Sequence, residues 1–474
     1  MKIAYLHYHL KPGGVTSVIR HQVQSLPPEA APLVLSGETP PTRFPATVVT
    51  LPGIGYDGTA DTAQPAGDIA TAIDRAIAHH FGGAGRCDLI HLHNPTLAKN
   101  SQMLAIIRHL QRRGYALLLQ IHDFAEDGRP SAYYREAAYP RDCHYSVINQ
   151  RDYGILKSSG LDPRGLHYLP NCIPAVIPPT ETAMDAGFIL LPVRAIRRKN
   201  IGEALLLSLC LSSGCEIYIT LPPNSPSDFP SYRHWQQLVT ICNLPVRFEM
   251  GLKKEFATLV QECRHVISTS ISEGFGFAYL EPWTAGKNLE GRLIPDICSD
   301  FSDAGVRLDH LYPRLKIPVA WIGCDRLIER FQACYSRICR SYGVTSQIPS
   351  ARTFTAPIEK MDTIDFGLLD EPLQTLVIRS VLADTEKLRR LKELNPPLMR
   401  LGRIPRSRRR MEHNREIISQ KYSLSAYGEA LQTIYHKVVN HTVHHRIDKL
   451  KLLRQFIDFD TFSLLKWNPF REDL

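Results

Sequence analysis

Short apolar segments alternate with amphipathic ones along most of this chain, and this alternation limits the possible folds more than any other feature. In the first half, apolar segments of strand length are separated by segments whose apolar residues recur with helical spacing. The strand segments are residues 2–8, 31–35, 47–51, 87–92, 115–121 and 144–148, and the helical segments are residues 15–26, 69–81 and 97–113. Strands that alternate with helices favour right-handed βαβ units, so the sequence predicts a parallel sheet.

The pattern breaks in a proline-rich stretch and then starts again. Residues 171–187 contain Pro174, Pro178 and Pro179 among small polar residues, a composition typical of an interdomain linker. The strand segments that follow are residues 187–193, 215–220, 246–250 and 266–269, and the helical segments are residues 201–211, 232–242 and 256–263. The sequence therefore predicts a second α/β domain, with the C-terminal strand ends of the two domains facing a cleft.

These breaks divide the chain into predicted parts. In chain order they are a Rossmann-like domain over residues 1–172, a linker over 173–186, a second Rossmann-like domain over 187–412, a long helix over 413–440 and a tail over 441–474. Within the second domain, residues 293–370 do not follow the alternation and are treated as an insertion without an assigned role.

The composition is that of an ordinary globular protein. Of its 474 residues, 44% are hydrophobic and 22% are charged, and no apolar run is long enough to span a membrane. The N-terminus is too interrupted for a signal peptide. Eleven cysteines at scattered spacings do not form a disulfide framework, so we expect a reducing, cytoplasmic setting.

The formal net charge is +9, and its densest concentration is the basic run at residues 400–410. Such a run is compatible with an anionic membrane surface or nucleic acid, but more often it is a solvated loop or helix start. No zinc-finger spacing or aromatic RNA-binding signature accompanies it, so no nucleic-acid partner is expected, whereas peripheral contact with a membrane stays open. The sequence does not indicate an oligomeric state.

Two carboxylates bracket a glycine turn after the strand segment that ends at Thr269. Glu273 precedes the turn and Glu281 follows it, and the turn itself consists of Gly274, Phe275, Gly276 and Phe277. Glycines let a backbone approach a ligand closely, and the helix expected after them would present unpaired N–H groups to an anion. A nucleotide sugar, with a diphosphate between two hydroxyl-rich groups, fits this arrangement. The alternative is a surface helix with two solvated acids.

A basic turn follows the first strand segment of the second domain. Arg194 and Lys199 lie five positions apart, a spacing that lets a guanidinium fork and an ammonium group grip one diphosphate. The alternative is a basic helix start, which the helix dipole disfavours unless an anion joins it. Arg197 and Arg198 are expected to be solvated.

The segment from Glu273 to Glu281 resembles the Glu, seven residues, Glu signature of retaining family 4 glycosyltransferases, which have the two-domain GT-B fold. The resemblance implies that Glu273 holds the transferred sugar and Glu281 the ribose of the nucleotide, while the glycine-turn amides contact the donor. Arg194 and Lys199 match the family's Arg, four residues, Lys pattern. A C-terminal helix that crosses back onto the first domain is also implied.

The resemblance extends to the first domain, which it makes the acceptor side, while the second domain binds the donor. His122, in a His-Asp pair at a strand end, would reach the transferred sugar and act with Glu273, Arg194 and Lys199 in catalysis. Gly13 and Gly14 resemble the family's N-terminal glycine loop, which approaches the donor phosphates. Neither a metal nor a cofactor is expected, because cationic side chains and helix ends neutralise the diphosphate.

One departure from the family pattern suggests an acceptor property. Arg292 stands where a small residue is usual, and Lys287 lies five positions before it. Cations at this place would favour an acceptor that carries a phosphate or carboxylate. A pair of surface salt bridges is the alternative.

The predicted reaction is transfer of a sugar from a nucleotide-sugar donor to a hydroxyl acceptor with retention of anomeric configuration. A phosphorylase or a nucleotide-sugar epimerase on the same fold would share the phosphate-binding residues and remains an alternative. A GT-B-like binding protein without turnover is the non-enzymatic alternative.

Overall fold

The computed structural model describes residues 1–58, 64–83, 85–174, 187–345, 347–402 and 407–470. It divides into two compact units: unit 1 is Met1–Pro174 with Gln420–Phe456, and unit 2 is Ala175–Ser419 with Ile457–Leu474. From position 175 onward, the predicted linker lies outside the described residues. Each unit has a parallel sheet with helices packed on it, which confirms the predicted α/β fold with two Rossmann-like domains.

Unit 1 is built on a seven-stranded parallel sheet with the order β3-β2-β1-β4-β5-β6-β7. Its strands are β1 (Ile3–His7), β2 (Leu33–Ser36), β3 (Thr47–Thr50), β4 (Leu89–His93), β5 (Ala116–Ile121), β6 (His144–Val147) and β7 (Leu166–Tyr168). Its helices are α1 (Gly14–Gln24), α2 (Ala66–Phe81), α3 (Met103–Arg112), α4 (Gln150–Ser158), α16 (Leu424–Asn440) and α17 (Lys449–Arg454). Most apolar strand segments read from the sequence become the buried centre of this sheet, because both of its faces are covered, whereas β3 at the edge is partly exposed.

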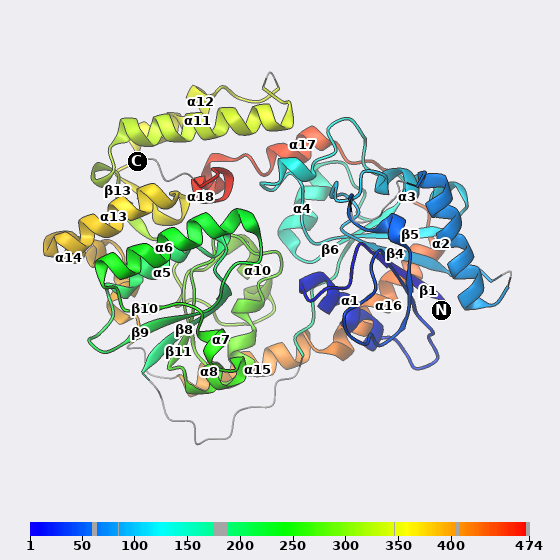
Figure 1. Ribbon diagram of the computed structural model, residues 1–474, viewed down its shortest axis with the longest axis horizontal. Helices are drawn as coiled ribbons and strands as arrows, with labels where there is room; N and C mark the ends of the chain where they lie inside the picture. Colours follow the sequence, from blue (N-terminus) through cyan, green and yellow to red (C-terminus); the bar gives the residue numbers. More distant parts are fainter. Residues whose placement is uncertain (59–63, 84, 175–186, 346, 403–406, 471–474) are drawn as a thin grey trace. The chain divides into compact units, whose positions relative to one another are not determined.

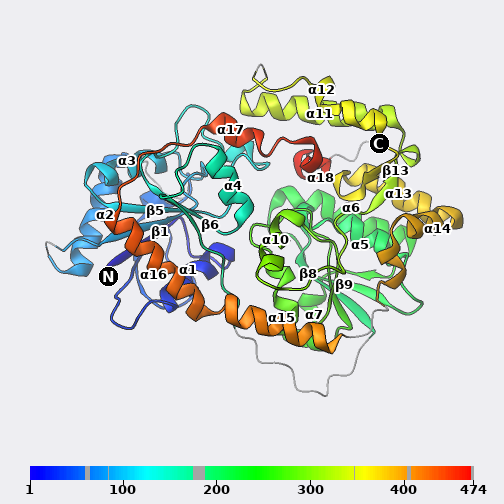
Figure 2. The same cartoon turned by 180° about the vertical axis from the view of Figure 1, so that it is seen from behind.

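The C-terminal part of the chain returns to unit 1 through α16. This helix packs against α1, β4 and β5, and Figures 1 and 2 both show it beside α1. Its buried face includes Leu431 and Tyr435 in one core cluster with Ile3 and Tyr5 of β1. Gly428 permits the close approach, since a Cβ there would lie 2.7 Å from the Ser25 carbonyl oxygen.

The sequence predicts one helix over residues 413–440, and the structure has two. The first is α15 (Arg408–Lys421), which falls largely in unit 2, and the second is α16 in unit 1. Ser423 separates them, because its side chain accepts a hydrogen bond from the backbone of Ala426 and so begins a new helix.

Unit 2 is built on a five-stranded parallel sheet with the order β10-β9-β8-β11-β12. Its strands are β8 (Phe188–Arg194), β9 (Glu216–Leu221), β10 (Val246–Arg247), β11 (His265–Ser268) and β12 (Leu289–Gly291). The helices that precede the insertion are α5 (Ile201–Ser208), α6 (Phe229–Cys242), α7 (Met250–Lys253), α8 (Phe256–Glu262) and α9 (Glu281–Thr284). None of the helices in the described part of the chain has both the length and the apolar character needed to cross a bilayer.

The insertion is mostly helical and packs within unit 2. Its elements and those that follow it are α10 (Pro295–Asp303), β13 (Lys316–Pro318), α11 (Cys324–Tyr342), α12 (Ala351–Thr355), β14 (Thr363–Asp365), α13 (Glu371–Ala383) and α14 (Thr385–Leu394). β13 and β14 form a separate antiparallel pair. The last helix, α18 (Leu464–Trp467), packs on α11, and the rings of Tyr342 on α11 and Trp467 on α18 lie 6.3 Å apart.

Candidate functional site

The strand order of unit 2 creates a switch point between β8 and β11. From β8 the chain moves outward through β9 to β10, then returns to place β11 on the other side of β8. In open parallel sheets, ligands bind outside the carboxyl ends of the strands where the order reverses in this way. The basic turn follows β8 and the glycine turn follows β11, so the topology brings the two sequence motifs to one place.

The basic turn has a tightly held backbone. Arg197–Lys199 forms a single 3₁₀ turn, and Asn200 then adopts a left-handed conformation (φ 52°, ψ 58°), which asparagine tolerates better than most residues. Thr269, just after β11, donates its hydroxyl hydrogen to the Lys199 carbonyl at 2.7 Å. This hydrogen bond joins the segment that follows β11 to the segment that follows β8. It therefore fixes the backbone position from which the Lys199 side chain extends.

Glu273 lies at the centre of the contacts between the two turns. Lys199 Nζ forms an ion pair with Glu273 Oε1, and Arg198 Nη1 lies 3.2 Å from Glu273 Oε2. Burial favours the protonated acid, but the two cations outweigh it and hold the pKa of Glu273 below its usual value. Glu273 is therefore ionised at neutral pH although its side chain is only 9% exposed.

The expectation that Arg197 is solvated is wrong, whereas the Arg198 side chain is 40% exposed but also forms an ion pair. Arg197 forms a bidentate pair with Glu371 at the start of α13, with N–O distances of 2.5 and 2.7 Å. Arg198 contacts Glu273, as described above. Consecutive residues of a 3₁₀ turn point about 120° apart. Arg197 therefore diverges from its neighbours and reaches α13, whereas the long side chains of Arg198 and Lys199 converge on Glu273.

The glycine turn is not followed by the longer helix that the sequence predicts. A 3₁₀ turn, Phe277–Tyr279, leads instead into the four-residue helix α9, which begins at Glu281. Pro282 accounts for the difference, because it has no N–H to donate and cannot lie inside a helix that begins at Phe277. Glu281 is exposed as a whole residue, but desolvation of its carboxyl by the surrounding protein raises the pKa of that group to about 6. Lys199 opposes this effect.

The other predicted donor-site residues of unit 2 lie at the edges of this arrangement. Arg194 ends β8 with an exposed side chain. Phe275 is buried with its ring 5.5 Å from that of Phe301, so its side chain belongs to the core. Gly276 has φ 95°, and a Cβ there would lie 3.0 Å from Ile297. Glycine is therefore required for the conformation of this turn.

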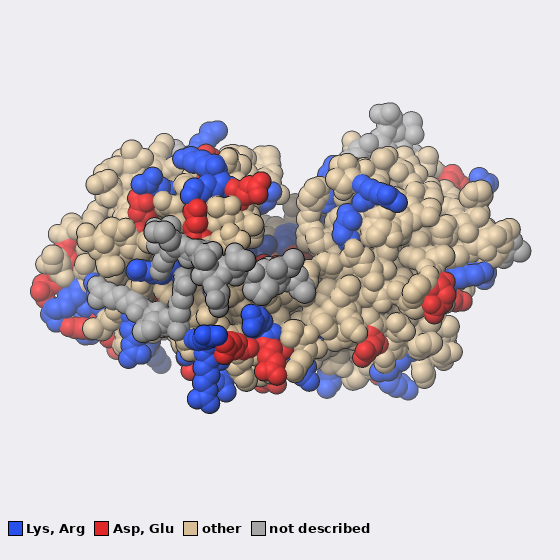
Figure 3. Space-filling view, turned by 90° about the horizontal axis from the view of Figure 1, so that it is seen from below, with Lys and Arg blue, Asp and Glu red and all other residues tan. Residues whose placement is uncertain are grey.

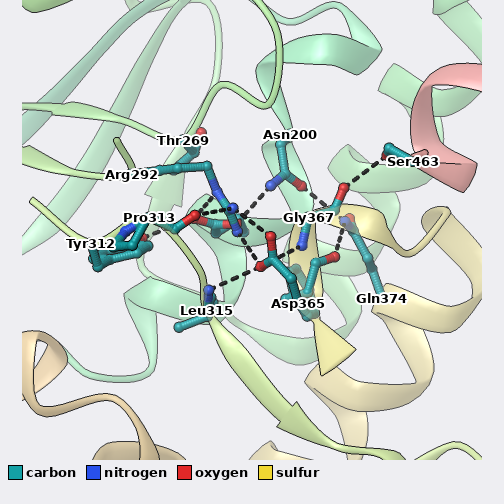
Figure 4. A network of polar contacts seen from close by, with 12 residues as sticks. Asn200, Thr269, Arg292, Tyr312, Pro313, Leu315, Asp365, Gly367, Gln374 and Ser463 are labelled. Carbon is teal, nitrogen blue, oxygen red and sulfur yellow. Dashed lines mark hydrogen bonds and ion pairs between the residues drawn. The ribbon is translucent and has the colours of Figure 1, made fainter. Parts of the chain in front are cut away.

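Arg292 and Lys287 do not have the predicted position for acceptor recognition. Arg292 is buried and donates to both Glu203 and Asp365, with Nη2–Oε2 at 2.5 Å and Nη1–Oδ2 at 2.8 Å (Figure 4). Lys287 is also buried, and its Nζ donates to the carbonyl oxygens of Gln261 and Cys263 at 2.7 and 2.8 Å. The prediction of a cation in the cleft and the alternative of a surface salt bridge are therefore both wrong. Both side chains are buried and form their hydrogen bonds inside unit 2.

The Arg292 network extends to the basic turn. Asn200 donates to Glu203 Oε2 at 2.7 Å and accepts from Gln374 Nε2 at 2.9 Å. Figure 4 shows Asn200, Gln374 and Gly367 next to the Arg292–Asp365 contact, with Ser463 donating to the Gly367 carbonyl. The insertion, through Asp365, thus supports the turn that carries Lys199.

Unit 1 has its own switch point, between β1 and β4. His122 follows β5 and is buried, and its Nε2 lies 2.9 Å from Nδ1 of His93, the last residue of β4. Burial lowers the pKa of His122 to about 4, although Asp123 opposes this effect. Asn94 fixes the backbone, because its Oδ1 accepts from the N–H groups of His122 and Asp123 at 2.7 and 3.1 Å.

Gly13 and Gly14 lie at the start of α1, near the carboxyl end of β1 in the sequence, and both are exposed. A Cβ added at Gly14 would meet no protein atom within 4 Å, so internal packing does not require a glycine there. No group of three or more His, Cys, Asp or Glu side chains among the described residues has a geometry that could hold a metal ion.

Sequence reasoning missed the contact of Arg198 with Glu273 and assigned no defined role to His93 or Asn94. A signal for His93 was present, since His91 and His93 are two apart on one strand and therefore share a face. Arg198 had no such signal, because its contact depends on the rotation of a 3₁₀ turn.

Two Rossmann-like units, each with polar residues at the carboxyl ends of its strands, define the GT-B fold of glycosyltransferases. Solved structures with this fold include sucrose-phosphate synthase from Thermosynechococcus elongatus, which is 14% identical, with a TM-score of 0.52 over 92% of this chain and 98% of its own. Anabaena HepE with UDP and glucose is 12% identical, with a TM-score of 0.52 over 91% and 98%. HepE with UDP-glucose is 14% identical, with a TM-score of 0.50 over 91% and 99%.

Among proteins of described activity, the chain is similar to mannosylglucosyl-3-phosphoglycerate synthase of Petrotoga mobilis. The two are 24% identical over 472 residues, which span 91% of this chain and 90% of the relative. No family model matches the chain. These similarities establish the GT-B fold and support a glycosyltransferase activity.

Proposed function

We propose that this protein is a retaining glycosyltransferase that transfers a sugar from a nucleotide-sugar donor to a hydroxyl acceptor. One observation carries the proposal: Arg198 and Lys199 meet Glu273 at the switch point of unit 2. Two cations and a carboxylate provide partners for both parts of the donor, because a diphosphate needs positive charge and sugar hydroxyls need an acceptor.

The ion pair between Lys199 and Glu273 gives a specific account of donor binding. A diphosphate brings more negative charge than one carboxylate, so it competes for Lys199 and Arg198. Glu273 is then released to accept hydrogen bonds from the sugar hydroxyls. Arg194, exposed at the end of β8, would supply a further contact with the diphosphate.

The remaining predicted residues complete the donor site in this proposal. Glu281 would bind the ribose hydroxyls, and the amides of the glycine turn (Gly274, Phe275, Gly276 and Phe277) would contact the phosphate and sugar. Gly13 and Gly14 would allow a phosphate to approach the backbone, in agreement with the open space around Gly14. The HepE complexes with UDP and UDP-glucose support a nucleotide-sugar donor.

In the reaction, the bond between the anomeric carbon and the diphosphate oxygen breaks, and the acceptor hydroxyl oxygen forms a new bond to that carbon on the same face. The hydroxyl proton leaves with the departing nucleoside diphosphate. Lys199 and Arg198 stabilise the charge that develops on the leaving group, and His122 donates a hydrogen bond to the transferred sugar. We propose that no metal or cofactor takes part, so a chelator should leave the activity unchanged.

We further propose an acceptor that bears an anionic group. The name of the Petrotoga mobilis relative describes a glycoside of 3-phosphoglycerate, a group with both phosphate and carboxylate. The buried positions of Arg292 and Lys287 mean that other residues would recognise this group. Glucosyl-3-phosphoglycerate and a neutral glucoside are a suitable pair of acceptors for the comparison.

The test begins with labelled UDP-glucose and GDP-mannose, first without an acceptor and then with each acceptor. Transfer to a hydroxyl acceptor, with the anomeric configuration of the donor kept in the product, is the expected result. Epimerised donor in the absence of an acceptor, or release of sugar that requires inorganic phosphate, would replace the proposal by an epimerase or a phosphorylase. If the protein binds the nucleotide but turns over no combination of donor and acceptor, it is a binding protein.

Two properties of the surroundings belong to the same proposal. All eleven cysteines are free thiols, which suits a reducing compartment such as the cytoplasm. Peripheral contact with an anionic membrane through the basic run 400–410 stays a proposal, and residues 403–406 of that run lie outside the described part. Arg408 is exposed but paired with Glu412 at 2.8 Å, and basic and acidic side chains are interspersed on the face in Figure 3.

A further inference from the structure

Unit 1 places several histidines side by side at its switch point. His7 ends β1, His91 and His93 lie on β4, and His122 follows β5, so they come from three adjacent strands. The rings of His91 and His93 stack at 4.5 Å, and those of His93 and His122 stack at 5.2 Å with 14° between their planes. All four side chains are buried.

His93 and His122 share one hydrogen bond between ring nitrogens, His93 Nδ1 and His122 Nε2, at 2.9 Å. Burial lowers the pKa of His93 well below its usual value and that of His122 to about 4. Both rings are therefore neutral at pH 7, and each carries one N–H. In such a pair, one ring must donate and the other must accept.

The second nitrogen of His93 decides the direction of this bond. His93 Nε2 is buried and has no hydrogen-bond partner among the described residues. If His122 donated, the proton of His93 would be on Nε2 and an N–H group would be buried without an acceptor. If His93 Nδ1 donates, Nε2 is a bare acceptor, which protein interiors tolerate more often than an orphaned donor.

We propose that His93 is a positioning residue that holds His122 in the tautomer with its proton on Nδ1, so that His122 offers a single N–H donor to a ligand. The proposal deepens the proposed function and rests on it for the identity of the ligand, an oxygen of the transferred sugar. Asn94 supports it, because it fixes the backbone of both His122 and Asp123. The bond from His93 then sets the orientation of the His122 ring and the nitrogen that carries the proton.

Histidine-selective ¹⁵N labelling and a long-range ¹H–¹⁵N spectrum test the tautomer without any substrate. The expected spectrum of the wild type shows a protonated Nδ1 and a bare Nε2 for His122, assigned through the signals that disappear in His122→Gln. A protonated Nε2 on His122 overturns the proposal. The spectrum is informative even if no glycosyl transfer is found, so the failure of the proposed function and the failure of this inference are distinguishable.

Replacements of His93 test the consequence for activity. The amide nitrogen of asparagine mimics Nδ1 of histidine and that of glutamine mimics Nε2, so His93→Asn keeps the donor and His93→Gln does not. His93→Leu and His93→Gln should lower kcat/KM on the order of 10- to 100-fold, which is the loss seen when the orienting partner of a metal-bound histidine is removed. His93→Asn should recover most of that loss.

Two controls separate positioning from folding. UDP binding, which does not involve the sugar, should change little in the His93 variants, and the exposed His79 should tolerate replacement by leucine without effect. Equal losses in the asparagine, glutamine and leucine variants would show that His93 acts through packing alone and would overturn the proposal. Unchanged kcat/KM in His93→Leu would do the same.

Discussion

Replacing Arg292 by methionine should destabilise unit 2 severely, because it removes the cation between two buried carboxylates. The side chain of Arg292 is 4% exposed, and that of Glu203 is 0% exposed. Breaking a buried ion pair by removing one partner costs about 3–5 kcal/mol. Methionine keeps much of the volume of arginine, so the loss reports the uncompensated charge rather than a cavity.

The assay uses the intrinsic fluorescence of the protein. All four tryptophans, Trp235, Trp283, Trp321 and Trp467, lie in unit 2, so their emission during urea unfolding reports this unit. With urea m-values of about 1–3 kcal/mol/M for small proteins, and a value near the upper end for a unit of this size, the midpoint should fall by about 1–2 M.

A matched control and a second substitution make the test of Arg292 specific. Lys254 also forms an ion pair, with Glu262 at 2.6 Å, but it is exposed, so Lys254→Met should cost at most about 1 kcal/mol. Adding Glu203→Gln to Arg292→Met should recover part of the loss, because one orphaned charge disappears. Equal midpoints for Arg292→Met and Lys254→Met would refute the structural role.

Three further predictions concern the proposed sites and acid stability. Lys199→Ala and Arg194→Ala should each cost about 2–4 kcal/mol of transition-state stabilisation, measured as a lower kcat/KM for the donor. Near-wild-type kinetics in both variants would contradict the phosphate-binding role. Glu281→Ala should mainly raise the donor KM, whereas Glu273→Ala should mainly lower kcat, and steady-state kinetics with the opposite pattern would exchange the two assignments. Burial lowers the folded pKa of His7 and His91 to about 3, below the usual 6.5, so stability should be lost as the pH falls through 6.5. At pH 5 the loss is about 2 kcal/mol per histidine, and a urea unfolding midpoint of the whole chain, followed by far-UV circular dichroism, that stays constant from pH 7 to 5 would exclude it.

The fold could be predicted from the sequence because apolar periodicity is a local property that both parallel sheets require. Strand segments such as 115–121 and 187–193 were found close to β5 and β8, which are buried on both faces. The exact end of a helix was less accessible, since Ser423 divides a continuous helical pattern through a cap. The ion-pair partners of the arginines could not be predicted from the sequence. Nothing near Arg197, Arg198 or Arg292 in the sequence distinguishes their partners, and two of these partners, Glu371 and Asp365, lie far away along the chain.

The two switch points differ in electrostatics, and this difference follows from the residues at the strand ends. In unit 2, Lys199 and Arg198 pair with Glu273 and hold the pKa of its carboxyl below the usual value, so this cluster contains formal charges. In unit 1, burial keeps His93 and His122 neutral, so that cluster offers hydrogen bonds without net charge. A nucleotide sugar has a charged diphosphate and an uncharged sugar. Under the proposed function, unit 2 therefore provides the affinity for the diphosphate, and the imidazoles of unit 1 contribute orientation of the neutral sugar.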